Sequence, residues 1–310
     1  MTTRTRPGDA DTGRVTDAPP RPRCVHAGID LAWGQRARTG LAVVSAEGSL
    51  MASASVHTDA EIRDFLAPYA ACLATVAVDA PLIVTNPTGQ RPCEREIGAV
   101  FGRYGAGAYP ANTSNPHFNP PRAATLAAAL GWHTDPAHTG RPGAPGCVEV
   151  YPHPAMVGLF SLPYTLPYKG RKGRDLASLE AAYAVLLDSM ERHLLELELP
   201  RSERWAQLRT IAANPGRKAD LERIEDEIDA IVCAHLAWLW SNRPDALHVY
   251  GDVSTGYIVA PPAPAHPPMR CPASTAHEQD PTGAPRSSGC AGNQSGRTHV
   301  MDGSRSPTKQ

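Results

Sequence analysis

Apolar and polar residues alternate along three short segments near the start of the chain. The segments read VHAGIDL, TGLAVVS and LMASASV, at residues 25–31, 39–45 and 50–56. Alternation of this kind predicts β-strands that bury one face. Because the connections between the segments are short, we expect three antiparallel strands that follow one another in sequence order.

A helical pattern comes next and is followed by a strongly apolar segment. Residues 58–73 place apolar side chains at helical spacing, and Thr58 and Glu61 fit a capping box at the start of the helix. Residues 74–82 read ATVAVDAPL. This nearly continuous apolar run predicts a central strand that is covered on both faces.

The second half of the chain alternates helical patterns with short strand patterns. We expect strands at 147–152 and 256–261 and helices at 93–104, 122–132, 176–199 and 218–241. Strands in sequence order, followed by strands separated by helices, are typical of a layered α/β domain with a mixed sheet.

The two ends of the chain differ in composition from its centre. Residues 1–22 and 262–310 are rich in Pro, Ser, Gly, Thr and single charges, whereas 42% of the whole chain is hydrophobic. Segments of this kind bury too little apolar surface to offset the entropy lost on ordering. We therefore expect two disordered tails and one domain over residues 23–261.

Charge and cysteine content narrow the functional classes. The net charge is −1, so binding to nucleic acid requires a local basic patch. The seven cysteines include no C-x-x-C pair, which disfavours a zinc ribbon or a thioredoxin-type site. With no signal-peptide pattern and no long apolar run, we expect a cytoplasmic protein that does not contact membranes. The oligomeric state stays open.

Two predicted strands end in a carboxylate. Asp30 follows the apolar part of 25–31, and Asp79 follows the apolar part of 74–82. Carboxylates are rare in apolar strands unless another group pairs with them or binds them. If the two strands are parallel neighbours, both side chains emerge at the carboxyl edge of the sheet, the usual site in α/β proteins.

The last predicted helix adds two more acids. Asp226 and Asp229 are three residues apart and are neighbours on the helix surface, beyond the first turn where the helix dipole favours acids. A solvated acidic face is the alternative explanation. Asp229 borders the apolar stripe, so we expect it to face Asp30 and Asp79 more directly than Asp226 does.

An acid-only cluster suits Mg²⁺ or Mn²⁺, because hard cations prefer carboxylate oxygens. Two such ions are a known device for displacement at a phosphodiester. On this hypothesis Asp30, Asp79, Asp226 and Asp229 are catalytic. Glu149, at the end of the strand at 147–152, joins them as a further ligand or general base. His153 follows in a segment that a rigid loop explains equally well.

Basic residues near these acids are candidates for contacts with substrate phosphates. Arg91 and Arg95 follow the strand that ends in Asp79, and a solvated helix face is their alternative role. The segment YKGRKGR contains Lys169, Arg171 and Lys172. It suits a phosphate backbone, although an ordinary solvated loop has the same composition.

The order of these motifs resembles a known family. GIDLAWGQRARTGLAVV resembles the opening hairpin of RuvC-type nucleases, which have the RNase H fold. Together with VAVDAPL, CERE, EVYPHPA and EDEIDAIVCAHLAW, it is similar to the bacterial and archaeal family named domain of unknown function 429, predicted to be RNase H-like nucleases. The resemblance spans most of 25–260. It implies a five-stranded mixed sheet with helices on both faces. It also implies that Asp30, Asp79 and one or both of Asp226 and Asp229 are metal ligands.

These observations favour a metal-dependent nuclease that acts on DNA or RNA. A non-catalytic binding or scaffold protein with the same fold is the first alternative. An actin-like ATPase or kinase is the second, but that class needs two domains with Gly-rich phosphate loops, for which this core is too short. No P-loop motif and no G-x-S-x-G motif occurs in the chain.

Overall fold

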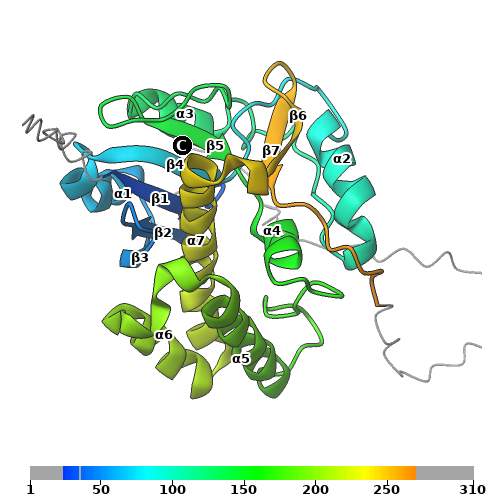
Figure 1. Cartoon of the computed structure of the whole chain (residues 1–310). Helices are drawn as coiled ribbons and strands as arrows, with labels where there is room; N and C mark the ends of the chain where they lie inside the picture. The colour runs from blue at the N-terminus through cyan, green and yellow to red at the C-terminus, as the bar shows by residue number, and fades with distance from the viewer. Residues whose placement is uncertain (1–23, 35, 270–310) are drawn as a thin grey trace, which may run out of the picture. The chain divides into compact units, whose positions relative to one another are not determined.

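The five expected main strands form one mixed sheet. In the computed structural model, which describes residues 24–34 and 36–269, the strand order is β3-β2-β1-β4-β5 (Figure 1). Pairing is antiparallel among the first three strands and parallel from β1 to β4 to β5. The strands are β1 (Val25–Asp30), β2 (Thr39–Val44), β3 (Leu50–Val56), β4 (Leu73–Asp79) and β5 (Gly146–Glu149).

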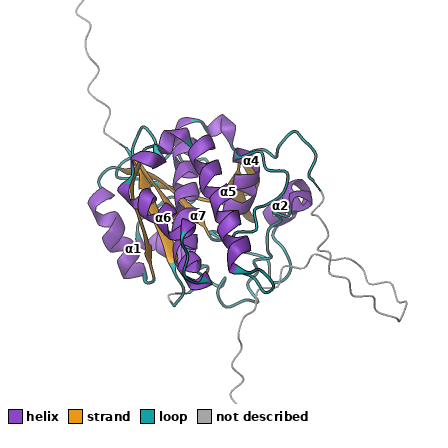
Figure 2. Cartoon of the chain, turned by 90° about the horizontal axis from the view of Figure 1, so that it is seen from below, coloured by secondary structure: helices purple, strands orange, loops and turns teal. Residues whose placement is uncertain are grey.

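Helices flank this sheet, as expected for the α/β class. Figure 2 shows α1 and α7 on opposite sides of the strands. The helices are α1 (Asp59–Leu66), α2 (Pro92–Phe101), α3 (Arg122–Ala129), α4 (Pro152–Leu159), α5 (Leu176–His193), α6 (Glu203–Ala213) and α7 (Lys218–Asn242). The predicted capping box at Thr58 and Glu61 is confirmed at the start of α1.

The expected strand at 147–152 ends early because a helix begins there. β5 stops at Glu149, and α4 starts with Pro152 in its first turn. Proline suits that position because its fixed φ is helical and its missing N–H would be unpaired anyway. The Pro-rich segment around His153 is therefore a helix start and not a loop.

Two further differences lie in the second half of the chain. The helix expected at 176–199 ends at His193, and α6 follows, with Trp205, Leu208 and Ala212 buried. The strand expected near 256–261 is β7 (Gly256–Ala260), but it pairs with β6 (His248–Asp252) in a separate two-stranded sheet.

Glycines in β1 and β2 bring α7 into direct backbone contact with the sheet. A Cβ on Gly28 would lie 2.0 Å from the Ala234 nitrogen. A Cβ on Gly40 would lie 1.7 Å from the Asp226 carbonyl oxygen. Any side chain at these positions would push the helix away. The contact therefore fixes the distance between α7, which carries Asp226 and Asp229, and the carboxyl end of β1.

We expect Gly28→Ala to destabilise the protein by about 2–3 kcal/mol, because the new methyl group meets backbone atoms that cannot rotate away. The matched control is Gly98→Ala in α2, where no atom lies within 4 Å of the added Cβ. That change should stabilise the helix by up to about 1 kcal/mol. Urea unfolding of both variants measures the difference in their free energies of unfolding. If the two variants are equally stable, the close contact between Gly28 and α7 does not constrain the fold.

The described chain continues past the predicted domain end at 261. The Tyr104 hydroxyl donates to the carbonyl of His266 at 2.7 Å, and the Met269 N–H donates to the carbonyl of Pro163 at 3.1 Å. The predicted tails at 1–22 and beyond 269 lie outside the described residues. None of the helices within the described ranges is long and apolar enough to cross a bilayer.

Candidate functional site

Asp30 and Asp79 meet at one edge of the sheet. They are the last residues of β1 and β4, which are parallel neighbours, and they are paired in register. This geometry confirms the placement that the sequence predicts. The Oδ2 atom of Asp30 is buried and has no hydrogen-bond partner among the described residues. A buried, unpaired carboxylate oxygen is costly and indicates a position for a ligand or a proton.

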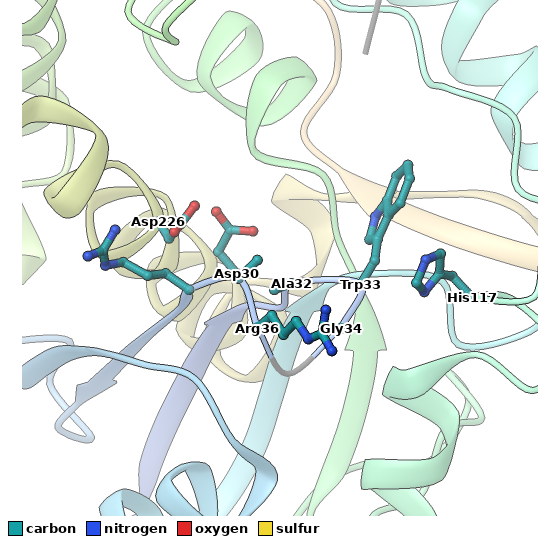
Figure 3. Close-up of a pocket in the computed structure, with 9 residues that line it drawn as sticks. Asp30, Ala32, Trp33, Gly34, Arg36, His117 and Asp226 are labelled. Atoms are coloured by element: carbon teal, nitrogen blue, oxygen red, sulfur yellow. The ribbon is translucent and has the colours of Figure 1, made fainter. Parts of the chain in front are cut away.

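The acids of α7 approach the same edge. Asp229 is fully buried, whereas Asp226 is partly exposed. Figure 3 shows the carboxylates of Asp226 and Asp30 close to each other beside a cavity that both line. The charge of Asp229 acts on Asp30 more strongly than that of Asp226 does. Asp229 is therefore the more deeply buried of the two helix acids, which agrees with its place beside the apolar stripe.

Lys169 brings a positive charge into this cluster. The residue lies in the loop between α4 and α5, and its Nζ atom is 2.8 Å from Asp229 Oδ2 and 3.5 Å from Glu225 Oε1. The Tyr168 hydroxyl donates to Asp229 Oδ1 at 2.7 Å. Although burial alone would lower the pKa of Lys169, the surrounding carboxylates raise it well above its usual value. The predicted contact of Lys169 with substrate is therefore replaced by ion pairs within the protein.

Burial is the largest cause of the raised pKa values in the acid cluster. It raises the pKa of Asp30 well above its usual value and the pKa of Asp79 to about 8. It also raises the pKa of Glu225 to about 7 and that of Asp226 to about 6. The other carboxylates act in the same direction, and Lys169 opposes them. Without a bound cation, the cluster therefore retains protons near neutral pH.

The raised pKa of Asp79 predicts a pH dependence of stability. Between about pH 4 and about pH 8 the unfolded chain has an ionised Asp79 while the folded protein keeps the proton, so stability falls as pH rises. The steepest slope from one such group is about 1.4 kcal/mol per pH unit. In EDTA, the stability of Asp79→Asn relative to wild type should therefore increase as the pH rises from about 4 to about 8. Urea unfolding at several pH values measures this. A stability difference between the two proteins that does not vary with pH would contradict the prediction.

Glu149 is not free to act as a metal ligand or base. Its Oε1 and Oε2 accept hydrogen bonds from Arg91 at 2.6 and 2.9 Å, and Oε2 also accepts one from the Leu82 N–H. Arg91 is 2% exposed and donates to Glu94 as well. The predicted roles of Glu149 in catalysis and of Arg91 in substrate binding are therefore corrected. Both residues belong to a buried ion-pair network beside the site.

The other predicted basic residues lie on the surface. Arg95 and Lys172 are exposed, and Arg95 Nη1 donates to the carbonyl of Gln90 at 2.7 Å. Arg171 is exposed and its Nη2 donates to the hydroxyl of Tyr109 at 3.3 Å. The structure does not bring these three side chains into the acid cluster. These three side chains could contact only a ligand that extends beyond the acid cluster.

His153 supports the cluster from outside. Its ring stacks on that of Tyr168 at 5.7 Å, and its Nδ1 atom lies 3.1 Å from Thr165 Oγ1. Burial lowers the pKa of His153 to about 3, so the imidazole is neutral at physiological pH. The side chain packs against Tyr168, which in turn holds Asp229. The structure thus gives His153 a packing role, but in the first turn of α4 and not in the rigid loop that the sequence suggested.

A cavity of about 700 Å³ opens beside the acids. Asp30 and Asp226 line one part of it. Sequence reasoning did not single out the residues on the other part, which are Ala32, Trp33, Gly34, Arg36, Ala37, Arg38 and His117. The sequence feature that could have identified them is the presence of one tryptophan and two arginines in the turn that directly follows Asp30.

The acids have the donor atoms that a divalent cation prefers, but their side chains are not yet positioned around one. Their donor atoms are all carboxylate oxygens, and Asp30 Oδ2 is unpaired. However, within residues 24–34 and 36–269 no three His, Cys, Asp or Glu side chains are already arranged to hold a metal ion. Asp30 and Asp79 are the ligands best placed for one. Asp229 would join them only after its pairing with Lys169 changes.

Most of the chain matches the pattern of a known protein family. The pattern of the family described as "Protein of unknown function (DUF429)" matches residues 28–255. No curated protein and no solved structure matches the chain. The matched range contains both sheet acids, α7 and the cavity.

Proposed function

The chain belongs to the DUF429 family of proteins of unknown function, and from the acids that its fold gathers we propose a metal-dependent hydrolase of phosphodiester bonds in DNA or RNA. The mixed sheet, with β1 to β3 antiparallel and β4 and β5 parallel, is compatible with an RNase H-like fold. The resemblance noted in the sequence points to the same class.

The observation that carries this proposal is the pairing of Asp30 with Asp79. Two carboxylates in register at the carboxyl ends of parallel strands lie where α/β proteins bind ligands. Asp226 and Asp229 approach from α7, and no described hydrogen bond satisfies Asp30 Oδ2. Like charges are gathered this closely when protons or a cation compensate them.

Asp30 and Asp79 would hold one Mg²⁺ or Mn²⁺ ion. Asp229 is the candidate ligand of a second ion. When bound, such ions polarise the phosphoryl group and lower the pKa of bound water. Lys169 balances part of the negative charge of Asp229 and Glu225 and fixes their side chains. In this way the cluster keeps its shape in the absence of metal.

Asp226 is the best candidate for a general base. It lines the cavity together with Asp30 and is partly exposed, so its carboxylate can reach a water molecule held there. Its carboxylate would accept the proton of the attacking water.

A second candidate function is a nucleic-acid binding protein without catalysis. The observation that favours it is the ion pair of Lys169 with Asp229, because the ammonium already supplies a cation to the cluster. In that case Mg²⁺ would neither stabilise the protein nor release protons from the acids.

Metal binding and cleavage together test the proposal. We expect Mg²⁺ to raise the melting temperature and to release protons at neutral pH, because Asp79 must ionise to bind it and the added positive charge would lower the pKa of Glu225. Calorimetry in two buffers of different ionisation enthalpy measures the proton release. A labelled oligonucleotide should be cleaved in Mg²⁺ and not in EDTA. Absence of both effects favours the second candidate.

A further inference from the structure

The cavity beside the acids is lined by aromatic and basic side chains as well as by Asp30 and Asp226. Trp33 is 42% exposed, and Arg36 and Arg38 come from the same turn between β1 and β2. In Figure 3, Trp33 and His117 stand on one side of the cavity and Asp226 on the other, with Asp30 and Arg36 between them. The volume of about 700 Å³ is within the usual range for pockets that bind small organic ligands.

Trp33 is held in place although much of its ring is exposed. Its indole packs against Phe118 in a T-shaped arrangement, with ring centroids 5.3 Å apart and planes at 69°. His117 lies on the same side at 6.2 Å. Phe118 is buried, so it anchors the indole to the core. An exposed but fixed aromatic ring offers a flat surface for another flat ring at little cost in entropy.

The two arginines remain available to a ligand. Arg36 is exposed and Arg38 is partly exposed, and no ion pair holds either guanidinium among the residues that the structure describes. The charge of Arg38 acts on Asp226, which lines the same cavity. This contrasts with Arg91, whose guanidinium is enclosed by carboxylates. Free guanidinium groups beside a cavity suit phosphate oxygens.

We propose that this cavity binds an unpaired nucleotide of a single-stranded nucleic acid, with its base stacked on Trp33 and its phosphate near Arg36 and Arg38. The inference rests on the proposed function, because it names the form of substrate that would reach Asp30. Bases within a duplex are already stacked on their neighbours, so only an unpaired base presents a free face to the indole.

The first test measures binding without cleavage. In EDTA at low salt, a labelled single-stranded oligonucleotide should bind more tightly than the duplex of the same sequence. Trp33→Leu should weaken single-strand binding by roughly 5- to 150-fold, the range for one base stacked on an aromatic side chain. Trp33→Phe should restore most of the affinity. Tyr69→Leu is the matched control, because Tyr69 is a partly exposed aromatic before the amino end of β4.

The second test separates phosphate contacts from stacking. Arg36→Ala should weaken binding to single strands and reduce its salt dependence by about one phosphate contact. Arg63→Ala, an exposed arginine on α1, removes the same charge elsewhere and should have little effect. Melting temperatures verify that each variant is folded.

The outcomes distinguish this inference from the proposed function. Equal affinity for single strand and duplex, or unchanged binding by Trp33→Leu, overturns the inference even if Mg²⁺-dependent cleavage is observed. A nucleoside monophosphate that binds as tightly as the oligonucleotide also overturns it, since the ligand would then be a free nucleotide. Single-strand binding that depends on Trp33 supports it even if no cleavage is found.

Discussion

Asp30→Asn should abolish Mg²⁺-dependent cleavage of nucleic acid. The change keeps the shape of the side chain but removes the charge of the carboxylate whose Oδ2 atom is buried and unpaired. On the proposed mechanism the cation supplies several kcal/mol of transition-state stabilisation, so the rate should fall by about a thousandfold or more. Cleavage of a labelled oligonucleotide by both proteins measures the effect.

The stability of the same variant provides an independent readout. Without metal, Asp30→Asn should be as stable as wild type or more stable, because it removes a carboxylate that lies among like charges and has one buried, unpaired oxygen. With Mg²⁺ at 100 times its Kd, wild type should gain about 2.7 kcal/mol and the variant less. Asp64→Asn, an exposed acid on α1, is the matched control. An identical response of all three proteins to Mg²⁺ would mean that Asp30 is structural.

Arg91→Met should destabilise the protein by about 3–5 kcal/mol, because it leaves the carboxylates of Glu94 and Glu149 buried without their partner. The loss should be smaller at acidic pH, where Glu149 can take up a proton. Burial already raises the pKa of Glu149, and without Arg91 it would rise further. Urea unfolding at acidic and neutral pH measures both effects.

Two further variants control for this result. Arg95→Met changes an exposed arginine in the first turn of α2, the helix that Arg91 precedes, and should alter stability by no more than about 0.5 kcal/mol. Adding Glu149→Gln to Arg91→Met should recover part of the stability, because it removes one of the unpaired charges. If Arg91→Met costs no more than Arg95→Met, the buried network contributes little to folding.

The sequence was sufficient to place the main sheet and its acids. Alternation identified β1, β2 and β3, and the apolar run identified β4. The two terminal carboxylates then followed from the rule that parallel strands end at one edge. Asp229 was also predictable, since helix geometry fixes which side of α7 faces the sheet. These features depend on local periodicity, which a single sequence records directly.

The remaining features depend on contacts between distant segments. Nothing near Arg91 or Glu149 indicates that they pair, because 58 residues separate them in the chain. Lys169 was predicted to contact substrate phosphates from a basic loop, yet the fold turns it toward Asp229. The helix α4 was missed because prolines usually interrupt structure, although Pro152 occupies the one helical turn that tolerates it.

The contact of Gly28 and Gly40 with α7 has a consequence for how the protein opens. Because the helix backbone lies directly on β1 and β2, neither side of the acid cluster can separate without breaking the central packing. Amide hydrogens of β1 and of α7 around Ala234 should therefore exchange with deuterium only through global unfolding. A ligand would therefore reach the acids through the cavity that is already open beside them, while the acids themselves stay in place.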